Sequence, residues 1–260
     1  MKDAKILLLD IETAPAEAYV WRRWKENIRP QQVISESYVM CAVGKQLGVQ
    51  EFMTSSLPDH PRWAADRFDD RAVVAQVWKW LDWADIVIAH NGNKFDLPTL
   101  NSRFIFHGLT PPSPYKTVDT LAVAKKVGRF PYNSLDALCE HLGLGRKKET
   151  GFQLWKDCRA GSPEAWRTML DYCEHDVLLL EKLYLRLRPW VVGHPNLVLH
   201  MNPTRSTCGR CGSTNLERRG TVKNLANVYQ RVQCRSCGGW GRIRLASAPR
   251  EDKKNITAPE

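Results

Sequence analysis

Four acidic side chains are placed where they could hold divalent cations. Asp10 and Glu12 stand two residues apart in an apolar run, and alternate residues of a β-strand point to the same face. Two buried carboxylates side by side repel each other unless a cation lies between them. Asp96 follows a second apolar run, and Asp176 stands four residues after Tyr172, on the same face of a predicted helix. Each piece alone also suits a strand-end cap or a surface pair, but together they favour a site for Mg²⁺ or Mn²⁺, which prefer carboxylate ligands.

The C-terminal part of the chain carries a second candidate metal site. The motifs Cys208-x-x-Cys211-Gly and Cys234-x-x-Cys237-Gly leave 22 residues between their inner cysteines. Their four thiolates suit one tetrahedral structural Zn²⁺, whereas a redox pair would need only one motif. The glycine after each second cysteine permits the tight turn that points backbone N–H groups at sulfur. We expect a hairpin between the motifs, and so small a module should need zinc to fold. The other cysteines are expected to be ordinary buried or helical thiols: Cys41, Cys139, Cys158 and Cys173.

Basic residues are concentrated in the same C-terminal part. Residues 200–250 carry ten Lys and Arg and one acid, whereas residues 1–199 carry 26 Lys and Arg and 24 Asp and Glu. A compact basic module beside a nearly neutral one is the footprint of nucleic-acid binding, although a basic surface can also serve solubility alone. Arginines mixed with aromatic side chains suit phosphate contact and base stacking. We therefore expect Arg210, Arg235 and Trp240 to contact the substrate, with a protein-docking module as the alternative.

The sequence also indicates where the protein works. We expect no secretory or membrane segment, because the first apolar run, Ile6 to Leu9, is broken by Asp10, far short of the roughly 20 residues that a membrane span needs. Eight cysteines in a chain without a signal peptide indicate thiols and metal ligands rather than disulfides. We therefore expect a cytoplasmic protein, in the host cytoplasm if a phage encodes it, with no membrane partner.

The hydrophobic pattern predicts the elements that must position these groups. We expect strands at residues 5–12, 38–45, 49–53 and 86–89, and an edge strand at 116–119. We expect helices at residues 72–83, 95–107 and 134–142, and a long helix from 162 to about 188. A loop with a short helix is predicted at 19–34, and a loop at 55–70. Strands followed by alternating strands and helices indicate an α/β domain with a mixed sheet flanked by helices.

In its motifs, the sequence resembles the DEDD superfamily of 3′→5′ exonucleases, which includes the proofreading domains of DNA polymerases. Asp10 and Glu12 match its first motif, Asn91 to Asp96 its second, and Tyr172 to Asp176 its third. The tyrosine four residues before the last aspartate is typical of the DEDDy branch, since the DEDDh branch would need a histidine where Asp171 stands. Ribonuclease H-like exonucleases of phages and bacteria, which carry His-Asn-Gly before the Phe-Asp, are the most similar group. The resemblance covers roughly residues 5–190.

The resemblance implies a ribonuclease H-like fold and two-metal-ion hydrolysis of phosphodiester bonds at the 3′ end of single-stranded nucleic acid, with DNA favoured. It implies that Asp10 bridges two Mg²⁺ or Mn²⁺ ions. Glu12 and Asp176 would complete the ligands of one ion, and Asp96 would hold the other directly or through water. Tyr172 would orient the attacking water, because a neutral tyrosine, with a pKa of about 10, is a weak base.

Residues around the second motif are candidate substrate contacts. The resemblance suggests that Asn91 binds the terminal nucleotide. His90 either touches the substrate or forms hydrogen bonds within its own turn, and the second alternative is favoured. Phe95 is either a core residue or a wedge between terminal bases. His175 is expected to lie on the helix surface rather than to act in catalysis.

These assignments divide the chain into a ribonuclease H-like exonuclease domain at 1–190, a linker at 191–206, a zinc ribbon at 207–246 and a disordered tail at 247–260. We expect the ribbon to hold the strand or a duplex junction, and a replication or repair protein is a candidate partner. Two other functions stay open. One is a structure-specific endonuclease on the same fold, because polarity depends on loops that close the site around a free end. The other is a catalytically silent nucleic-acid-binding protein, against which the complete set of carboxylates argues.

Overall fold

The computed structural model describes residues 4–201, 203–224 and 227–247. The chain forms two compact units, one of residues 5–184 and one that contains the residues from 185 onward. The boundary falls inside the last long helix, a few residues before the boundary at 190 that we predicted from the sequence. Of the predicted disordered tail, residues 248–260 lie outside the described residues.

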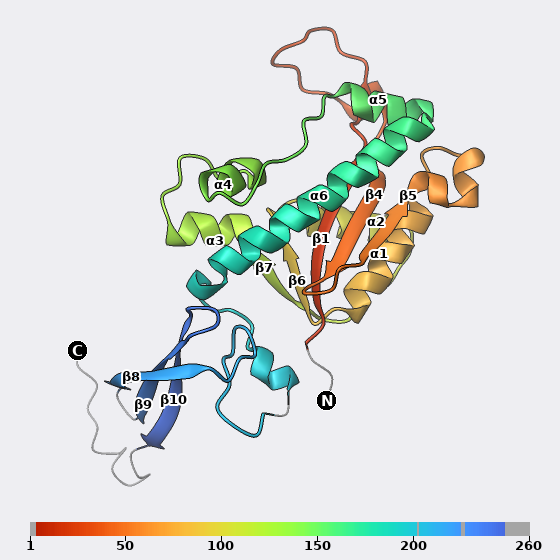
Figure 1. The fold of residues 1–260 in the computed structure, drawn as a ribbon. Coiled ribbons are helices and arrows are strands. Elements are labelled where there is room, and N and C mark those ends of the chain that lie inside the picture. Colours follow the sequence, from red (N-terminus) through yellow and green to blue (C-terminus); the bar gives the residue numbers. More distant parts are fainter. Residues whose placement is uncertain (1–3, 202, 225–226, 248–260) are drawn as a thin grey trace. The chain divides into compact units, whose positions relative to one another are not determined.

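A mixed sheet forms the centre of the larger unit (Figure 1). Its strands are β1 (Ile6–Thr13), β4 (Val39–Gln46), β5 (Phe52–Ser56), β6 (Ile86–Ala89) and β7 (Lys116–Asp119), in the order β5-β4-β1-β6-β7. Strand β1 pairs with β4 antiparallel and with β6 parallel. The mixed sheet confirms the predicted fold class, and β7 lies at the sheet edge as expected. Strand β5 begins three residues later than predicted, because the turn after β4, with Gly48 at φ +81°, extends through the residues that follow it.

Three helices cover the two faces of the sheet: α1 (Arg71–Trp83), α2 (Asp96–Phe106) and α6 (Pro163–Leu187). The odd-numbered side chains of β1, from Leu7 to Ile11, are buried in one apolar cluster with residues of α1 and α2. The even-numbered side chains of β1 therefore point to the opposite face. Helix α6 crosses the sheet there (Figure 1). A buried ion pair of 2.6 Å between Lys45 of β4 and Glu181 of α6 ties the helix to this face.

Three shorter helices join these elements: α3 (Thr120–Val127), α4 (Leu135–His141) and α5 (Gln153–Ala160). Helix α4 was predicted, and the hydroxyl of Ser134 caps it by accepting a hydrogen bond from the Ala137 N–H at 3.3 Å. Helices α3 and α5 were not predicted, because two turns of helix bury too few residues to give a clear periodicity. Among the described residues, no helix is both long and apolar enough to cross a membrane.

Short elements lie in or next to the segments 19–34, predicted as a loop with a short helix, and 55–70, predicted as a loop. They are β2 (Glu17–Ala18), β3 (Val33–Ser35) and single turns of 3-10 helix at Pro30–Gln32, Leu57–Asp59 and Pro61–Ala64. A proline stands in the first turn of each 3-10 helix, where its missing N–H leaves no hydrogen bond unmade. The segment 55–70 is therefore more ordered than predicted.

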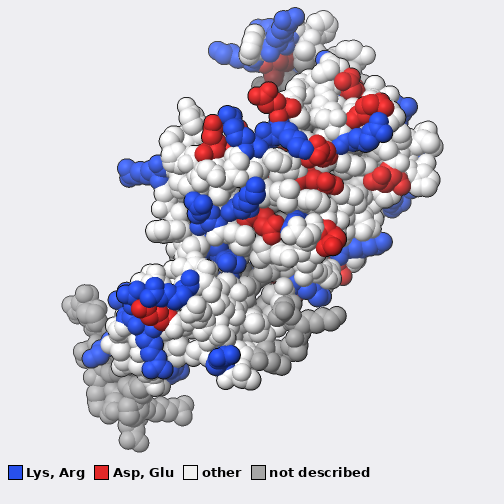
Figure 2. Space-filling view, viewed as in Figure 1, with Lys and Arg blue, Asp and Glu red and all other residues white. Residues whose placement is uncertain are grey.

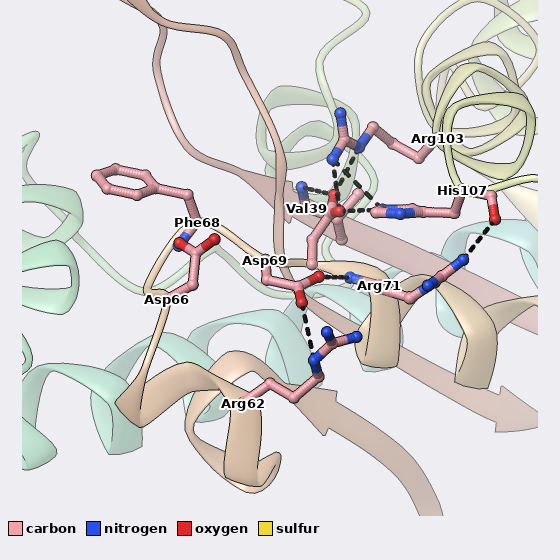
Figure 3. A network of polar contacts seen from close by, with 9 residues as sticks. Val39, Arg62, Asp66, Phe68, Asp69, Arg71, Arg103 and His107 are labelled. Carbon is pink, nitrogen blue, oxygen red and sulfur yellow. Dashed lines mark hydrogen bonds and ion pairs between the residues drawn. The ribbon is translucent and has the colours of Figure 1, made fainter.

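A buried carboxylate fixes α1 against α2 and β4 (Figure 3). Asp70, at the start of α1, is fully buried and accepts two hydrogen bonds from Arg103 of α2, at 2.7 and 2.6 Å. It also accepts from the Val39 N–H at 2.9 Å and lies 2.6 Å from Nε2 of His107. A buried charge is tolerated only when it is paired and hydrogen-bonded, so this network specifies how α2 sits on the sheet.

The smaller unit contains a three-stranded antiparallel sheet. Its strands are β8 (Leu216–Lys223), β9 (Asn227–Cys234) and β10 (Trp240–Ser247), in the order β10-β9-β8. Two further turns of 3-10 helix, Arg188–Trp190 and Leu197–His200, precede it. Strands β8 and β9 form the predicted hairpin, and β10, which follows the second cysteine motif, was not predicted.

Candidate active site and zinc centre

Asp10 and Glu12 lie on the face of β1 that α6 crosses. Both residues are paired with β4, opposite Val43 and Cys41. The pairing of β1 with β6 ends at Leu8, so both carboxylates stand beyond the point where these two parallel strands separate. Strand β4 holds the backbone of Asp10 and Glu12 on one side, and β6 does not pair with it on the other. Side chains from elsewhere in the chain can therefore approach the two carboxylates.

Helix α6 brings Tyr172 and Asp176 to the same place. Carboxylate oxygens of Asp10, Glu12 and Asp176 all lie within 4.8 Å of one another. The Cys173 thiol, on the same helix, donates a hydrogen bond to Oδ2 of Asp10 at 3.2 Å. The ring of Tyr172 is buried and packs edge-to-face against Trp155 of α5, with ring centroids 6.4 Å apart. Two acids of β1 and a third more than 160 positions later in the sequence thus form one acidic cluster.

Asp96 stands at the start of α2 with only 3% of its surface exposed. The backbone N–H of Ile11 donates to its carboxylate, which places Asp96 beside the β1 pair. The turn before it needs a glycine, since a Cβ on Gly92 would lie 2.4 Å from Cβ of Ala89. The structure therefore brings the fourth acid to the cluster, although it is not among the three whose oxygens lie within 4.8 Å of one another.

Asp119 holds the turn that precedes Asp96. Its carboxylate accepts hydrogen bonds from the backbone N–H groups of Asn91 and Asn93, at 3.0 and 3.2 Å. It also caps α3 by accepting from Leu121 N–H at 3.0 Å. Asn91 needs this support because it adopts a left-handed backbone conformation, with φ +66°.

Burial raises the pKa of every acid in the cluster. It raises the pKa of Asp10 to about 6, with the Asp176 charge adding to the effect, and the pKa of Glu12 to about 8, with the Asp10 charge adding. Burial and the Asp10 charge raise the pKa of Asp96 well above its ordinary value. Burial also raises the pKa of Asp176, against the opposing effect of Lys147. The cluster therefore resists full ionisation at neutral pH unless positive charge is supplied.

Lys147 is a member of the site that sequence reasoning missed. Its Nζ forms an ion pair with Asp176 and donates to the Tyr172 hydroxyl at 3.1 Å. Burial lowers the pKa of Lys147, but the Asp176 charge and the hydrogen bonds to Asp176 and Tyr172 together outweigh burial, and the pKa is raised overall. The backbone around it is fixed, because Lys147 N–H donates to Asp136 at 2.7 Å and His175 lies 2.7 Å from the Arg146 carbonyl. The ammonium group supplies one positive charge to the cluster.

The residues of the cluster fit divalent cations such as Mg²⁺ or Mn²⁺. They offer hard carboxylate oxygens, which these ions prefer. Oδ1 of Asp176 is buried and has no hydrogen-bond partner among the described residues, so it is free to serve as a ligand. One lysine does not balance three carboxylates and Asp96, and cations would remove the remaining repulsion.

The structure places the candidate substrate contacts as follows. His90 lies 2.9 Å from the Thr120 hydroxyl and 3.0 Å from the Asn133 carbonyl, so both ring nitrogens have partners. Burial lowers its pKa, which keeps the ring neutral. The side chain of Asn91 is half-buried at the turn, and Phe95 is 43% exposed, which favours the wedge interpretation of Phe95 over the core interpretation.

The four cysteines of the two motifs converge in the smaller unit. Sulfur atoms of Cys208, Cys211, Cys234 and Cys237 all lie within 4.8 Å of one another. Both motifs form the expected tight turns, in which Gly212 and Gly238 have positive φ and donate to the carbonyl of the first cysteine, at 2.9 and 2.8 Å.

The donor set of this cluster fits Zn²⁺. Backbone N–H groups of Ser236 and Cys237 point at the sulfur of Cys234, and together with neighbouring thiols they outweigh burial and lower its pKa to about 7. Burial raises the pKa of Cys208, although the N–H groups of Arg210 and Cys211 oppose the rise. Four converging sulfurs, three of them with backbone N–H groups directed at them, are arranged to hold thiolates around a tetrahedral ion.

Basic side chains gather on the visible face of the smaller unit (Figure 2). The three that we expected to contact the substrate differ in their surroundings. A guanidinium nitrogen of Arg210 donates to the Val191 carbonyl, and Arg235 forms a 2.6 Å ion pair with Glu217. Trp240 is 46% exposed and has Arg231 4.9 Å from its ring centroid. Of the three, Trp240 has an aromatic ring at the surface that can stack on a base.

Two positioning residues gave weak signals in the sequence. Asp119 ends the predicted edge strand at 116–119, and aspartate is a typical N-cap residue for a helix that follows. Lys147 lies in the run Arg146-Lys147-Lys148, which gives no indication of which cation turns inward. Only the fold identifies it.

Comparison with known proteins gives one family match. The sequence matches the family model described as the RNase_H superfamily over residues 46–188, a range that contains Asp96, Tyr172 and Asp176 but begins after β1. No curated protein matches. Among solved structures, the family B DNA polymerase from the hyperthermophilic archaeon Pyrobaculum calidifontis is 16% identical with a TM-score of 0.49, over 73% of this chain and 26% of the polymerase chain. This chain thus spans about a quarter of that polymerase's length.

Proposed function

Because the chain belongs to the RNase_H superfamily, a fold of metal-dependent nucleases, we propose that it is a 3′→5′ exonuclease of the DEDDy type acting on single-stranded nucleic acid, with DNA favoured. The observation that carries the proposal is the convergence of Asp10, Glu12 and Asp176 within 4.8 Å, with Asp96 beside them. Burying like charges together is costly, and divalent cations remove that cost.

The carboxylates would hold two Mg²⁺ or Mn²⁺ ions. Asp10 interacts with each of the other three acids, since its charge raises the pKa of Glu12 and of Asp96 and the Asp176 charge raises its own, so Asp10 is the natural shared ligand. When bound, such ions make a water molecule more acidic and stabilise the leaving oxygen of a phosphodiester.

Tyr172 and Lys147 would position the attacking water. Burial raises the pKa of Tyr172 to about 12, so the phenol stays neutral and acts through hydrogen bonds rather than as a base. The Lys147 ammonium donates to the phenol oxygen at 3.1 Å, which leaves the phenol hydrogen free to turn toward Asp176 or a water. Trp155 and Lys147 together fix the direction of the hydroxyl.

The cysteine cluster would hold one structural Zn²⁺, which makes the smaller unit a zinc ribbon. We propose that its Arg and aromatic side chains, Trp240 above all, help hold the strand or a duplex junction. A cytoplasmic location and a replication or repair partner belong to the same proposal.

Linear and circular single-stranded DNA of one sequence test the polarity of the reaction. An exonuclease degrades the linear strand and leaves the circle, and a 3′-terminal block protects the linear strand as well. Cutting of the circle at a similar rate would replace the proposal with an endonuclease.

A further inference from the structure

An unusual arm projects from the larger unit between β2 and β3. We define the arm as residues 19–29, with the sequence Tyr-Val-Trp-Arg-Arg-Trp-Lys-Glu-Asn-Ile-Arg. Figure 1 shows this segment as a loop beyond the end of β1, near α5. Its base is anchored, because β2 and β3 pair with each other and Glu17 forms a 2.6 Å ion pair with Arg159 of α5.

The polar side chains of this segment hold its backbone together. The Glu26 carboxylate accepts hydrogen bonds from the backbone N–H groups of Trp21 and Arg22, at 3.1 and 2.7 Å. Those two N–H groups lower the pKa of Glu26. The Gln32 amide donates to the Tyr19 carbonyl at 2.9 Å and to Glu26 at 3.2 Å. Glu26, the one acid of the arm, is thus hydrogen-bonded within this segment.

The apolar rings of the arm point to solvent instead. Trp21 is 92% exposed and Trp24 is 83% exposed. Large exposed rings that cluster in one segment indicate an interaction site, because burying these rings against a partner would be favourable. The arm also carries four exposed cations: Arg22, Arg23, Lys25 and Arg29. With Glu26 its net charge is therefore +3, which suits a polyanion that also has rings to stack.

The arm stands close to the acidic cluster along the chain. Tyr19, the first residue of the arm, is seven positions after Glu12, and an extended chain spans at most about 3.6 Å per residue, so the two lie within about 25 Å. A stacked strand advances about 3.4 Å per nucleotide, so this reach corresponds to about seven nucleotides. One strand can touch the arm and the cluster together.

We propose that the arm is a stacking platform for single-stranded nucleic acid, on which Trp21 and Trp24 stack on bases while Arg22 and Arg23 contact phosphates. The inference rests on the proposed function, because that function places the reacting end of the bound strand at the acidic cluster. Aromatic stacking with flanking arginines is how proteins bind single strands without reading their sequence.

Binding without cleavage tests the arm separately from catalysis. We would measure fluorescence anisotropy of a labelled strand of about 16 nucleotides, the upper end of single-domain site sizes, in an Asp10→Asn background without Mg²⁺ or Mn²⁺. Stacking contributes a factor of about 5 to 150 per base, so Trp21→Ala with Trp24→Ala should weaken binding at least about 20-fold. The double Phe variant at the same positions should keep most of the affinity.

Two further variants complete the design. Arg22→Gln with Arg23→Gln should reduce the slope of log affinity against log salt by about 1.4, since single strands give about 0.7 per phosphate contact. Ile105→Ala, which removes a side chain that is 78% exposed on α2, is the matched control and should bind like the parent. Thermal melting of each variant verifies folding.

The proposal fails if the double Ala variant binds within twofold of the parent, or if the double Phe variant loses as much affinity as the Ala variant. If the double Ala variant had a different molecular mass in solution from the parent but the same affinity, the arm would mediate self-association, and the proposal would also be overturned. Absence of cleavage by the wild-type chain, with these binding effects present, would instead count against the proposed exonuclease.

Discussion

Removing one carboxylate charge should stabilise the metal-free protein, and the effect should depend on pH. Glu12→Gln keeps the shape of the side chain and removes its ionisation. Burial and the Asp10 charge raise the Glu12 pKa from 4.5 to about 8 in the folded state. The folded state therefore binds this proton more tightly than the unfolded state, so the associated stability is complete below pH 4.5 and is lost as the pH rises through about 8.

The size of this loss follows from the linkage between pKa and stability. One pKa unit corresponds to 1.36 kcal/mol, so ionisation of Glu12 in the folded protein costs on the order of 3–5 kcal/mol. For a unit of this size, 1 kcal/mol shifts the melting temperature by roughly 2–4 °C. The Glu12 ionisation alone should therefore lower the melting temperature of the wild type by about 10 °C between pH 5.5 and pH 8.5, and Glu12→Gln should remove that share of the pH dependence, while the other acids of the cluster keep theirs.

The assay is thermal melting of zinc-loaded protein dialysed free of Mg²⁺ and Mn²⁺, at both pH values. Adding Mn²⁺ at pH 8.5 should raise the melting temperature of the wild type and have less effect on Glu12→Gln. Glu149→Gln, which removes an exposed acid, is the control and should melt like the wild type. If the melting temperatures of wild type and Glu12→Gln depended equally on pH, the reasoning that the buried carboxylates repel one another and are stabilised by cations would be refuted.

Other predictions concern the parts around the cluster. Asp70→Asn breaks a buried ion pair with Arg103, so it should cost about 3–5 kcal/mol in the free energy of unfolding, measurable by denaturant titration, and a cost below about 1 kcal/mol would contradict this role. Tyr172→Phe should lower kcat about 100-fold with little change in KM, since it removes the hydroxyl that orients water and keeps the ring, and an unchanged kcat would remove Tyr172 from the site. Cys208→Ser should lower the zinc content below one ion per chain and make the backbone amides of β8 to β10 exchange hydrogen faster, because the unit needs zinc to fold. Amides that remain fully protected from exchange without zinc would show that the unit folds by itself. Deleting residues 200–260 should weaken binding to long strands and flatten its salt dependence while the carboxylate cluster keeps its metal response, and an unchanged salt slope would exclude the ribbon from binding.

The elements that carry the acids could be predicted because their patterns are strong. Strand β1 begins with a run of four apolar residues, and α6 has about seven turns of periodicity with a proline at its start. In contrast, α3 and α5 are eight residues each, too short for a periodic signal. The extra strand β10 mixes exposed apolar and basic side chains without a clear alternation, and is specified by pairing with β9 rather than by its own pattern.

The residues of the candidate site also divide into those that the sequence predicts and those that only the fold identifies. Spacing places Asp10 with Glu12 on one strand face and Tyr172 with Asp176 on one helix face, whereas the resemblance was needed to add Asp96 and to assign roles. Lys147 and Asp119 could not be identified in this way, since their roles come from long-range contacts that no local pattern encodes. The outward direction of Trp21 and Trp24 was equally hidden, because a tryptophan in a sequence is usually read as a core residue.

The most direct test of the central claim is cleavage of a 5′-labelled single-stranded oligonucleotide by wild type and Asp10→Asn, with Mg²⁺ or Mn²⁺ or without divalent ions. The proposed function predicts a ladder that shortens from the 3′ end, present only for the wild type with a divalent ion, because Asp10 is the carboxylate shared by the cluster. Cleavage by Asp10→Asn at the wild-type rate, or no cleavage by the wild type with either ion, would contradict it.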